Sequence, residues 1–350
     1  MISSWFVQDL TLPRPNRRAN HIISALGSSS IKKGKEFVAS HIPDVSPAVY
    51  DKYEDVYADP NVDIVYIGTP HAFHRQNALD SIRAHKHVLC EKPFTVNARE
   101  AAEVLEAARR EGVFVMEAMW TRFRPLVAEL RRQIFDERVI GDVQRAFCDF
   151  GLEIDLAALP ASSRLKSRDL GAGSLLDIGI YSLTWGLLTL DENIADSAAK
   201  MGVTGIQTIR EGIDTTSTVV LQYPNSGRQG ILTSTLDFQS SSTFCRIEGS
   251  KGHIEVSGAA ASAPSSFTVH RKGIANSENN GTCAGEPSSL VFNFDEPGFG
   301  FYYEADAVAG DIAAGRKENE LMPHAETLRV LSILDEVRRR GGASFPQDEV

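Results

Sequence analysis

The stretch Val88-Leu89-Cys90-Glu91-Lys92-Pro93-Phe94 decides the fold of the first part of the chain. Its apolar residues predict a strand that is buried on both faces, as in a parallel sheet. Proline cannot donate to a sheet ladder, so the strand ends where Lys92 emerges. Ligands of open α/β sheets lie beyond the carboxyl ends of the strands, which places Lys92 where a ligand would bind. A solvated pair of opposite charges before a turn is the alternative interpretation.

Strands and helices alternate at short intervals through the first 120 residues. The opening segment has helical spacing, and an Ala/Glu/Arg-rich helix has Asn97 as its expected N-cap and Gly112 after its end. This alternation predicts a doubly wound, Rossmann-type parallel sheet over residues 1–120. Its expected strands are residues 21–26, 62–68, 86–90 and 113–116, and its expected helices are residues 2–10, 32–38, 72–85 and 98–111.

After Trp120 the apolar pattern changes to alternating segments that are separated by turn-forming sequences. The second domain, residues 121–350, is therefore predicted to be a mainly antiparallel open-sheet α+β domain with helices on one face. We expect its strands at residues 143–154, 216–223, 230–238, 244–248 and 253–256, its helices at 124–137, 174–190, 303–314 and 325–340, and a loop at the small-residue stretch 258–266.

Composition and charge exclude several classes of protein. The formal charge of -10 over 350 residues argues against nucleic acid or an anionic membrane as the main partner. No run of eighteen apolar residues is present to span a bilayer. The opening residues contain no basic segment followed by an apolar one, so we expect a cytoplasmic protein. Four cysteines without metal-binding spacing favour free thiols in a reducing compartment: Cys90, Cys148, Cys245 and Cys283.

Four motifs, in this order along the chain, carry a resemblance that runs from Ile2 to about Gly341. With them the chain resembles the glucose-fructose oxidoreductase/inositol dehydrogenase/MocA family, closest to the branch of dimeric dihydrodiol dehydrogenases and fungal NADP-dependent D-xylose dehydrogenases. The motifs are Thr69-Pro70-His71 with His74, Cys90-Glu91-Lys92-Pro93-Phe94-Thr95, Glu117-Ala118-Met119-Trp120-Thr121-Arg122-Phe123 and Gly171-Ala172-Gly173-Ser174-Leu175-Leu176-Asp177-Ile178-Gly179-Ile180-Tyr181.

The chain departs from the family pattern at its front. Family members begin with a strand and a glycine-rich turn, which brings backbone N–H groups to the pyrophosphate of the cofactor. Here Met1 falls where the following helix begins, so the sheet is expected to lack its first, central strand and to expose backbone groups along two neighbours. An incomplete gene model or a wrong start codon is the expected explanation, with a short inactive isoform as the alternative. Cofactor binding by the chain as written stays open.

The resemblance implies a catalytic group made of Lys92, Tyr181 and Asp177. Hydride transfer from a hydroxyl-bearing carbon needs a group that takes the hydroxyl proton and a positive charge that favours the developing oxyanion. Tyrosine titrates near ~10, so Tyr181 needs a neighbouring cation to act as a base. Asp177 precedes it by four residues, on the same helix face, and would orient substrate hydroxyls or the lysine. A structural ion pair of Lys92 with Glu91 and a buried, hydrogen-bonded tyrosine are the alternatives.

The segment after the first expected strand favours NADP over NAD. An NAD enzyme usually holds the ribose hydroxyl with an acid at this point, whereas this chain offers Ser28 and Ser29, followed by Lys32 and Lys33. A 2′-phosphate would be accepted there, and no carboxylate would repel it. No third ligand accompanies the two histidines after Pro70, so we expect no metal site. The predicted cofactor-binding residues are Ser28, Ser29, Lys32, Thr69, Pro70, His71, His74, Asn77, Glu91 and Lys92.

Together these features predict an NADP-dependent oxidoreductase that acts on a small sugar or diol, with D-xylose oxidised to its lactone as the leading hypothesis. Trp120 and Arg122, together with Asp177, are the predicted substrate-binding residues. Oxidation of trans-1,2-dihydrobenzene-1,2-diol is the alternative activity. A truncated, non-catalytic paralogue that binds a sugar or the cofactor is the alternative from another class. The open sheet face and the resemblance favour a homodimer, without nucleic acid or membrane partners.

Overall fold

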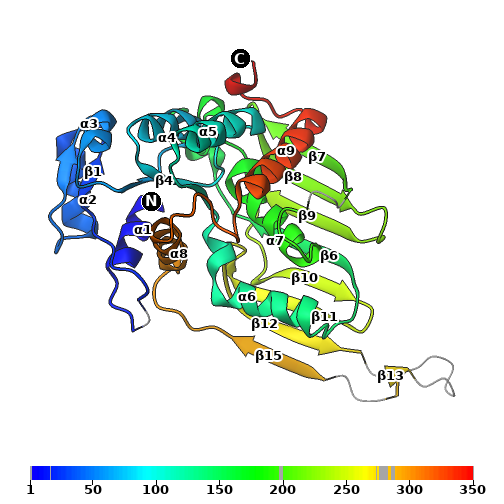
Figure 1. Cartoon of the computed structure of the whole chain (residues 1–350). Helices are drawn as coiled ribbons and strands as arrows, with labels where there is room; N and C mark the ends of the chain where they lie inside the picture. The colour runs from blue at the N-terminus through cyan, green and yellow to red at the C-terminus, as the bar shows by residue number, and fades with distance from the viewer. Residues whose placement is uncertain are drawn as a thin grey trace. The chain divides into compact units, whose positions relative to one another are not determined.

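We describe the protein from a computed structural model, in which residues 2–15, 17–196, 200–272, 274–275, 283–284 and 288–349 are described. The chain forms two compact units (Figure 1). Unit 1 comprises Met1–Phe123 and Glu296–Leu331, and unit 2 comprises Arg124–Asp295 and Ser332–Val350. The first break lies close to the division expected after residue 120. The expected second domain, 121–350, differs from unit 2 because Glu296–Leu331 packs with the first unit.

The parallel sheet of unit 1 contains the strand that the sequence marked as buried. Strand β4 (His87–Glu91) lies between β3 (Ile64–Ile67) and β5 (Val115–Ala118), and both pairings are parallel. The side chains of Val88 and Cys90 are fully buried, which confirms a strand that is covered on both faces.

A second, two-stranded parallel sheet of unit 1 is made by β1 (Ala25–Gly27) and β2 (Ala48–Tyr50). Among the described residues β1 and β3 each pair with a single strand, as expected for a sheet that lacks a central strand. The strand expected at 21–26 is shorter and begins later, at Ala25. His21 lies outside it, with its Nε2 2.7 Å from the Asp306 carboxylate.

The helices of unit 1 follow the local start and stop signals closely. In α5 (Ala98–Glu111), the Asn97 side chain accepts a hydrogen bond from the backbone N–H of Glu100, and Gly112 adopts the left-handed conformation at the C-cap. Asn97 and Gly112 therefore mark the two ends of α5, as the sequence predicted. The other helical segments are α1 (Ile2–Thr11), α2 (Ile31–His41), α3 (Tyr53–Ala58), the 3₁₀ segment His71–Phe73, α4 (His74–Arg83), the 3₁₀ segment Trp120–Phe123 and α8 (Phe301–Ala313).

Helix α8 belongs to unit 1 because it packs on α1. The Asp9 carboxylate accepts hydrogen bonds from the backbone N–H groups of Phe299 and Phe301, at 2.9 Å each, and so holds the start of α8. The Arg14 guanidinium binds Asp306 on α8 through two hydrogen bonds of 2.8 and 2.9 Å. These contacts join segments nearly 300 residues apart, which local sequence patterns could not reveal.

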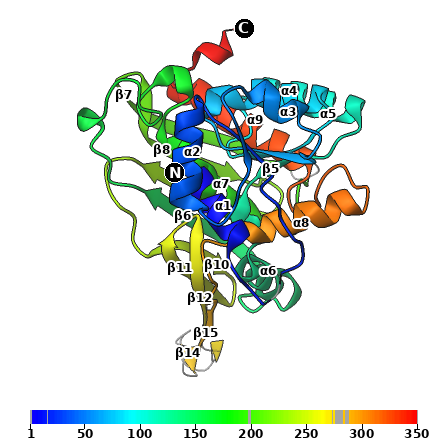
Figure 2. The same cartoon turned by 90° about the vertical axis from the view of Figure 1, so that its left-hand side faces the viewer.

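Unit 2 is built on an eight-stranded sheet in the order β15-β12-β11-β10-β6-β9-β8-β7. All neighbours are antiparallel except β6 and β9, and Figure 2 shows β7 and β15 at opposite ends of the sheet. The strands are β6 (Val143–Gly151), β7 (Gly202–Arg210), β8 (Ile213–Gln222), β9 (Gln229–Thr235), β10 (Thr243–Gly249), β11 (Gly252–Ala260), β12 (Ala263–Arg271) and β15 (Ser289–Asn293); β13 (Ile274–Ala275) and β14 (Cys283–Ala284) form a separate pair.

The prediction of a loop at residues 258–266 is wrong. Gly258 pairs with Pro264 and Ala260 with Ala263, so the stretch forms the end of β11, a tight turn and the start of β12. Small residues fit here because the Cβ that a side chain at Gly258 would add meets the backbone of Ala263 and Pro264. Strands β7, β12 and β15 were missed, since their alternating patterns are interrupted by polar and small residues.

The helices of unit 2 cover one face of this sheet. Helix α7 (Ile180–Leu190) packs against β6 and β9, and α6 (Pro125–Arg131) packs against β12. Both adjoin a π-helical turn, Arg132–Asp136 after α6 and Leu175–Gly179 before α7. The remaining helical segments are Leu156–Ala158, Arg168–Leu170, Pro346–Asp348 and α9 (His324–Gly341), which begins in unit 1.

The segment Arg168–Leu190 is long and apolar enough to cross a membrane by composition, although no strictly apolar run of eighteen residues was found in the sequence. Its most apolar window is entirely buried inside the protein, which is typical of a core helix. Three cysteines, Cys90, Cys148 and Cys245, are free and buried. The side chain of Cys283 lies outside the described residues.

Candidate active site

Lys92 follows β4 directly, and its peptide bond to Pro93 is cis. The neighbouring strand end is tied to this turn by His74. This histidine is completely buried, with Nδ1 2.9 Å from the carbonyl oxygen of Pro93 and Nε2 2.8 Å from that of Thr69. Burial and the charge of Lys92 lower the pKa of His74, while the carbonyl groups act in the opposite direction. His74 therefore holds two strand-end loops together, with both ring nitrogens engaged by the backbone.

Glu117, at the end of β5, holds the other side of the Lys92 turn. Its Oε1 accepts a hydrogen bond of 3.1 Å from the backbone N–H of Phe94, and its side chain is buried. Burial raises the pKa of Glu117 to about 7, against opposing contributions from the Phe94 N–H, the Thr327 hydroxyl and Arg122. The carboxyl group thus changes charge near neutral pH. Sequence reasoning cited Glu117 only as part of a motif, although a lone acid at the end of an apolar strand was a usable signal.

Glu91 is oriented from the opposite side of β4. The Tyr66 hydroxyl donates a 2.7 Å hydrogen bond to Glu91 Oε1, and Phe6 of α1 stacks on the Tyr66 ring. Glu304 of α8 is also buried in unit 1, and neither of its carboxyl oxygens has a hydrogen-bond partner among the described residues. Burial, with the charge of Glu91, raises the pKa of Glu304 well above the ordinary value and so favours its neutral form.

The predicted cofactor residues after β3 form one connected group. The Asn77 amide donates to Thr69 Oγ1 at 3.2 Å and accepts from the Tyr57 hydroxyl at 3.2 Å. The ring of His71 lies 5.8 Å from that of His74, and both side chains are buried. The structure thus brings Thr69, Asn77 and His74 together with the Lys92 turn in unit 1. Contact of any of them with a cofactor stays a prediction.

The serines after β1 lie at the N-terminus of α2. Ser30 caps this helix by accepting a hydrogen bond from the Lys33 backbone N–H, and the Lys33 ammonium donates to Ser29 Oγ at 3.3 Å. Lys32 points elsewhere, since its ammonium lies 3.9 Å from Glu36 and is largely exposed. A hydroxyl, an ammonium group and a helix N-terminus suit a phosphate group, so these residues fit the 2′-phosphate of NADP. Of the two lysines named from the sequence, Lys33 is the one whose ammonium lies beside Ser29.

Trp120 and Arg122 stand in the 3₁₀ segment after β5. Trp120 is buried and stacks on Phe301 of α8 with a ring separation of 4.4 Å. The Arg122 guanidinium is buried and bonded to Glu326, 2.5 Å away, in an ion pair that is shielded from water on both sides. The Arg122 guanidinium is therefore neutralised by Glu326 inside unit 1. Contact of Arg122 with a substrate stays a prediction.

Asp177 and Tyr181 lie in unit 2, on the π-helical turn and on α7. Both side chains are buried, and the Arg164 guanidinium donates to Asp177 Oδ1 at 3.2 Å. The Tyr181 ring packs 5.7 Å from that of Phe150. An acid that is paired with an arginine, and a phenol four residues further along the chain, are able to bind hydroxyl groups and to move a proton. Arg164 was not among the predicted site residues.

Asp214 fixes the start of the segment that carries Asp177 and Tyr181. Its Oδ2 accepts hydrogen bonds from the Leu175 backbone N–H at 2.7 Å and from the Ser174 and Ser217 hydroxyls at 2.8 Å each. A glycine is required at position 173, just before this segment. The φ angle of Gly173 is +141°, and an added Cβ would lie 2.1 Å from Asp214 Oδ1. The Gly-Ala-Gly-Ser motif is explained by this close approach.

Two sequence profiles match the chain over most of its length. One, described as an oxidoreductase family with an NAD-binding Rossmann fold, matches residues 5–119. The other, described as the GFO/IDH/MocA C-terminal domain, matches residues 129–255. The chain belongs to the GFO/IDH/MocA oxidoreductase family. The resemblance expected from the four motifs is thereby confirmed.

Two relatives within this GFO/IDH/MocA family align with nearly the whole chain. The trans-1,2-dihydrobenzene-1,2-diol dehydrogenase of Sus scrofa is 35% identical over 349 residues, covering 100% of this chain and 96% of its own length. The D-xylose 1-dehydrogenase (NADP(+)) of Hypocrea jecorina is 31% identical over 362 residues, covering 99% of this chain and 91% of its own length. Both belong to the branch that the motifs indicated.

A solved structure supports the fold of this family member. KijD10, a 3-ketoreductase from Actinomadura kijaniata, superimposes with a TM-score of 0.77 at 21% identity, over 96% of this chain and 93% of that protein. At this identity the similarity establishes the fold alone. It agrees with a parallel Rossmann-type sheet followed by a mainly antiparallel sheet domain.

Proposed function

We propose that this GFO/IDH/MocA family member is an NADP-dependent oxidoreductase that oxidises a hydroxyl group of a small sugar or diol, with D-xylose oxidised to its lactone as the leading reaction. The observation that carries the proposal is the position of Lys92. It emerges from the carboxyl end of a buried parallel strand, and His74 and Glu117 fix the turn that follows it. Ligands of open parallel sheets bind at that end.

NADP, when bound, supplies the hydride acceptor. In the proposed reaction Tyr181 takes the proton of the substrate hydroxyl, and the Lys92 ammonium stabilises the negative charge that develops on its oxygen. Asp177, held by Arg164, accepts hydrogen bonds from further hydroxyl groups and so orients the substrate. A substrate with several hydroxyl groups can contact Tyr181, Lys92 and Asp177 at once, which favours a sugar or a vicinal diol.

NADP rather than NAD is supported by the residues at the start of α2. Ser29 and the Lys33 ammonium lie within hydrogen-bond distance of each other beside the α2 N-terminus, and an anionic phosphate is stabilised by such a group. The name of the Hypocrea jecorina relative also specifies NADP(+).

A second substrate is favoured by one specific observation. The relative from Sus scrofa, at 35% identity, is named as a trans-1,2-dihydrobenzene-1,2-diol dehydrogenase. Oxidation of a cyclic trans-diol therefore remains the alternative activity. The non-catalytic paralogue is the third hypothesis, and it requires that the chain bind sugar or cofactor without turnover.

Two measurements on the purified 350-residue protein test these proposals. In a fluorescence titration with NADPH and NADH, we expect NADPH to bind more tightly. A panel of D-xylose, other aldoses and trans-dihydrodiols, assayed by formation of NADPH, then identifies the substrate. Highest kcat/KM for D-xylose supports the leading reaction, and highest kcat/KM for a dihydrodiol supports the alternative. Binding of NADPH without turnover of any member of the panel would contradict the enzymatic proposal.

Assembly and location are further parts of the proposal. The sheet face of unit 2 that is not covered by helices carries exposed apolar side chains such as Ile206, and a homodimer would bury this face. Sedimentation velocity of the purified chain tests this directly, and a monomer at all concentrations would contradict it. We also propose a cytoplasmic location, which fractionation of the source cells would check.

A further inference from the structure

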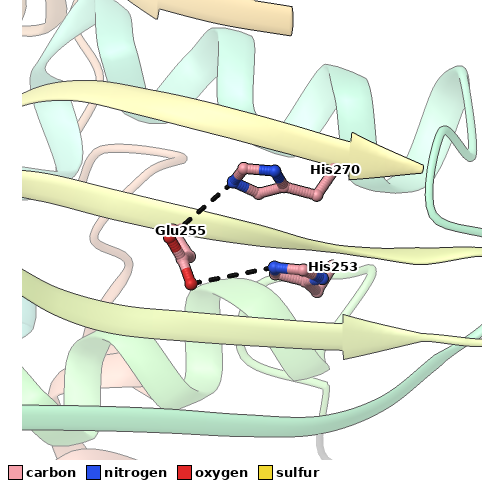
Figure 3. A group of neighbouring side chains, drawn as sticks. All are labelled: His253, Glu255 and His270. Atoms are coloured by element: carbon pink, nitrogen blue, oxygen red, sulfur yellow. Dashed lines mark ion pairs between the residues drawn. The ribbon is translucent and has the colours of Figure 1, made fainter. Parts of the chain in front are cut away.

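Three potential metal ligands meet on the uncovered face of the unit 2 sheet. His253 on β11 is the direct cross-strand partner of His270 on β12, and Glu255 follows His253 by two residues on the same face. The intervening Ile254 and the following Val256 point the other way and are fully buried. Figure 3 shows the three side chains turned toward one another. They are within reach of solvent, with 27%, 36% and 32% of the His253, Glu255 and His270 side chains exposed.

The distances between these ligand atoms suit a tetrahedral ion. Glu255 Oε1 lies 3.7 Å from His253 Nε2, and Glu255 Oε2 lies 3.7 Å from His270 Nε2. All three ligand atoms lie within 4.8 Å of one another, and the two imidazole rings are stacked at 4.6 Å. Zinc bonds of ~2.0–2.2 Å separate neighbouring ligand atoms by ~3.4 Å. Small side-chain rotations therefore bring all three atoms to bonding distance.

The hydrogen bonding of His270 also suits a metal. His270 Nδ1 lies 3.1 Å from the Ser289 hydroxyl on β15, a contact that can hold the proton on Nδ1 and leave the lone pair of Nε2 free. Neutral imidazole is the form that binds metal ions.

The surrounding charges permit the ion. Arg246 on β10 donates to Glu255 Oε1 at 2.9 Å and to Glu248 Oε1 at 3.0 Å. Glu248 is also bonded to Arg145 on β6. If Glu255 turns toward a metal, Arg246 keeps Glu248 as its carboxylate partner. The cluster therefore offers a cation one carboxylate and two imidazole nitrogens.

We propose that His253, Glu255 and His270 form a binding site for a zinc ion, with a fourth coordination position that these three residues leave open. Sequence reasoning expected no metal site, because it looked for ligand spacing along the chain. The two histidines are instead seventeen positions apart and are joined by the register of a hairpin. Bound zinc would clamp β11 to β12 at this point.

The test uses the full-length chain without a histidine tag, freed of metal with a chelator and then dialysed. Titration with Co²⁺, followed by its visible d–d absorption, is expected to show one ion per chain in tetrahedral coordination, displaced by Zn²⁺. Because the same face is proposed to form the homodimer, the ions are counted per chain in whichever assembly the protein adopts. The absence of saturable Co²⁺ binding, or octahedral absorption alone, would overturn the proposal.

Four variants make this test specific. Replacing a ligand in His253→Ala or His270→Gln should weaken Co²⁺ binding about 100-fold, and Ser289→Ala should weaken it about tenfold. The control His41→Ala removes a half-buried histidine on α2, in the other unit, and should bind as the wild type does. Melting temperatures without metal verify that each variant is folded. Binding by both ligand variants with wild-type affinity would overturn the site, whatever the Ser289 result.

Discussion

The buried Glu117 carboxylate accepts a hydrogen bond from the backbone N–H of Phe94, two residues after the proposed catalytic Lys92. An ionisable group thus fixes the turn that presents the lysine. Because the pKa of Glu117 is raised to about 7, the charge of the carboxyl group that holds this turn changes within the physiological pH range. The position of the lysine and the stability of unit 1 are therefore both linked to pH.

Glu117→Gln should remove part of the pH dependence of stability. Below pH 4.5 Glu117 is protonated in both the folded and the unfolded chain, and its contribution is fully present. Above the ordinary pKa, Glu117 is ionised in the unfolded chain but still protonated in the folded one, so the stabilisation declines as the pH rises. It is lost once the pH has passed through the folded-state pKa of about 7, where the folded chain also loses this proton. Between pH ~5 and ~8 the wild type should lose about 2 kcal/mol more of its free energy of unfolding than the variant.

Urea denaturation of both proteins at the two pH values measures this difference. Glu106→Gln, on the exposed face of α5, is the matched control and should keep the wild-type dependence. Equal pH dependence of the wild type and Glu117→Gln would show that Glu117 does not titrate in this range.

Lys92→Met and Tyr181→Phe should each lower kcat by about 10²–10⁴-fold, because each removes a group that acts on the transferred proton or the developing charge. Steady-state kinetics on the substrate found in the panel, with melting temperatures beside them, provide the measurement. NADPH binding should persist in Tyr181→Phe. Lys251→Met, in the exposed turn between β10 and β11, is the control. Turnover near the wild-type value in either variant would remove that residue from the mechanism.

Lys33→Ala should weaken NADPH binding about tenfold and leave NADH binding unchanged, because only NADPH carries the 2′-phosphate. Lys35→Ala, also exposed on α2, is the control and should bind both cofactors as the wild type does. Fluorescence titrations of the three proteins compare the dissociation constants. An unchanged ratio of NADPH to NADH affinity in Lys33→Ala would mean that Ser29 and Lys33 do not form the phosphate site.

Gly173→Ala should destabilise the protein by at least ~2 kcal/mol. Its φ of +141° is strained for alanine, and the new Cβ would meet Asp214 Oδ1, which holds the segment of Asp177 and Tyr181. Gly310→Ala on α8 is the control, since its Cβ meets nothing within 4 Å and should stabilise the helix by ~0.5–1 kcal/mol. Thermal and urea unfolding report both changes. Equal stability of Gly173→Ala and the wild type would show that the close approach to Asp214 relaxes freely.

The sequence by itself determined the elements that are governed by local signals. The apolar run before Lys92 became the buried strand β4, and Asn97 and Gly112 mark the ends of α5 as expected. Four motifs in order were sufficient to indicate the family. Such features depend on residues close together in the chain, where periodicity, capping and proline act directly.

Only the tertiary structure decided which distant groups meet. Helix α8 joins unit 1 through Asp9 and Arg14. The small-residue stretch 258–266 becomes a hairpin in which Gly258 lies against the backbone of Ala263 and Pro264. Glu117 and the pair His253 and His270 acquire their partners in the same way. Each depends on strand register or helix packing between separated segments, and a single sequence carries no direct record of those contacts.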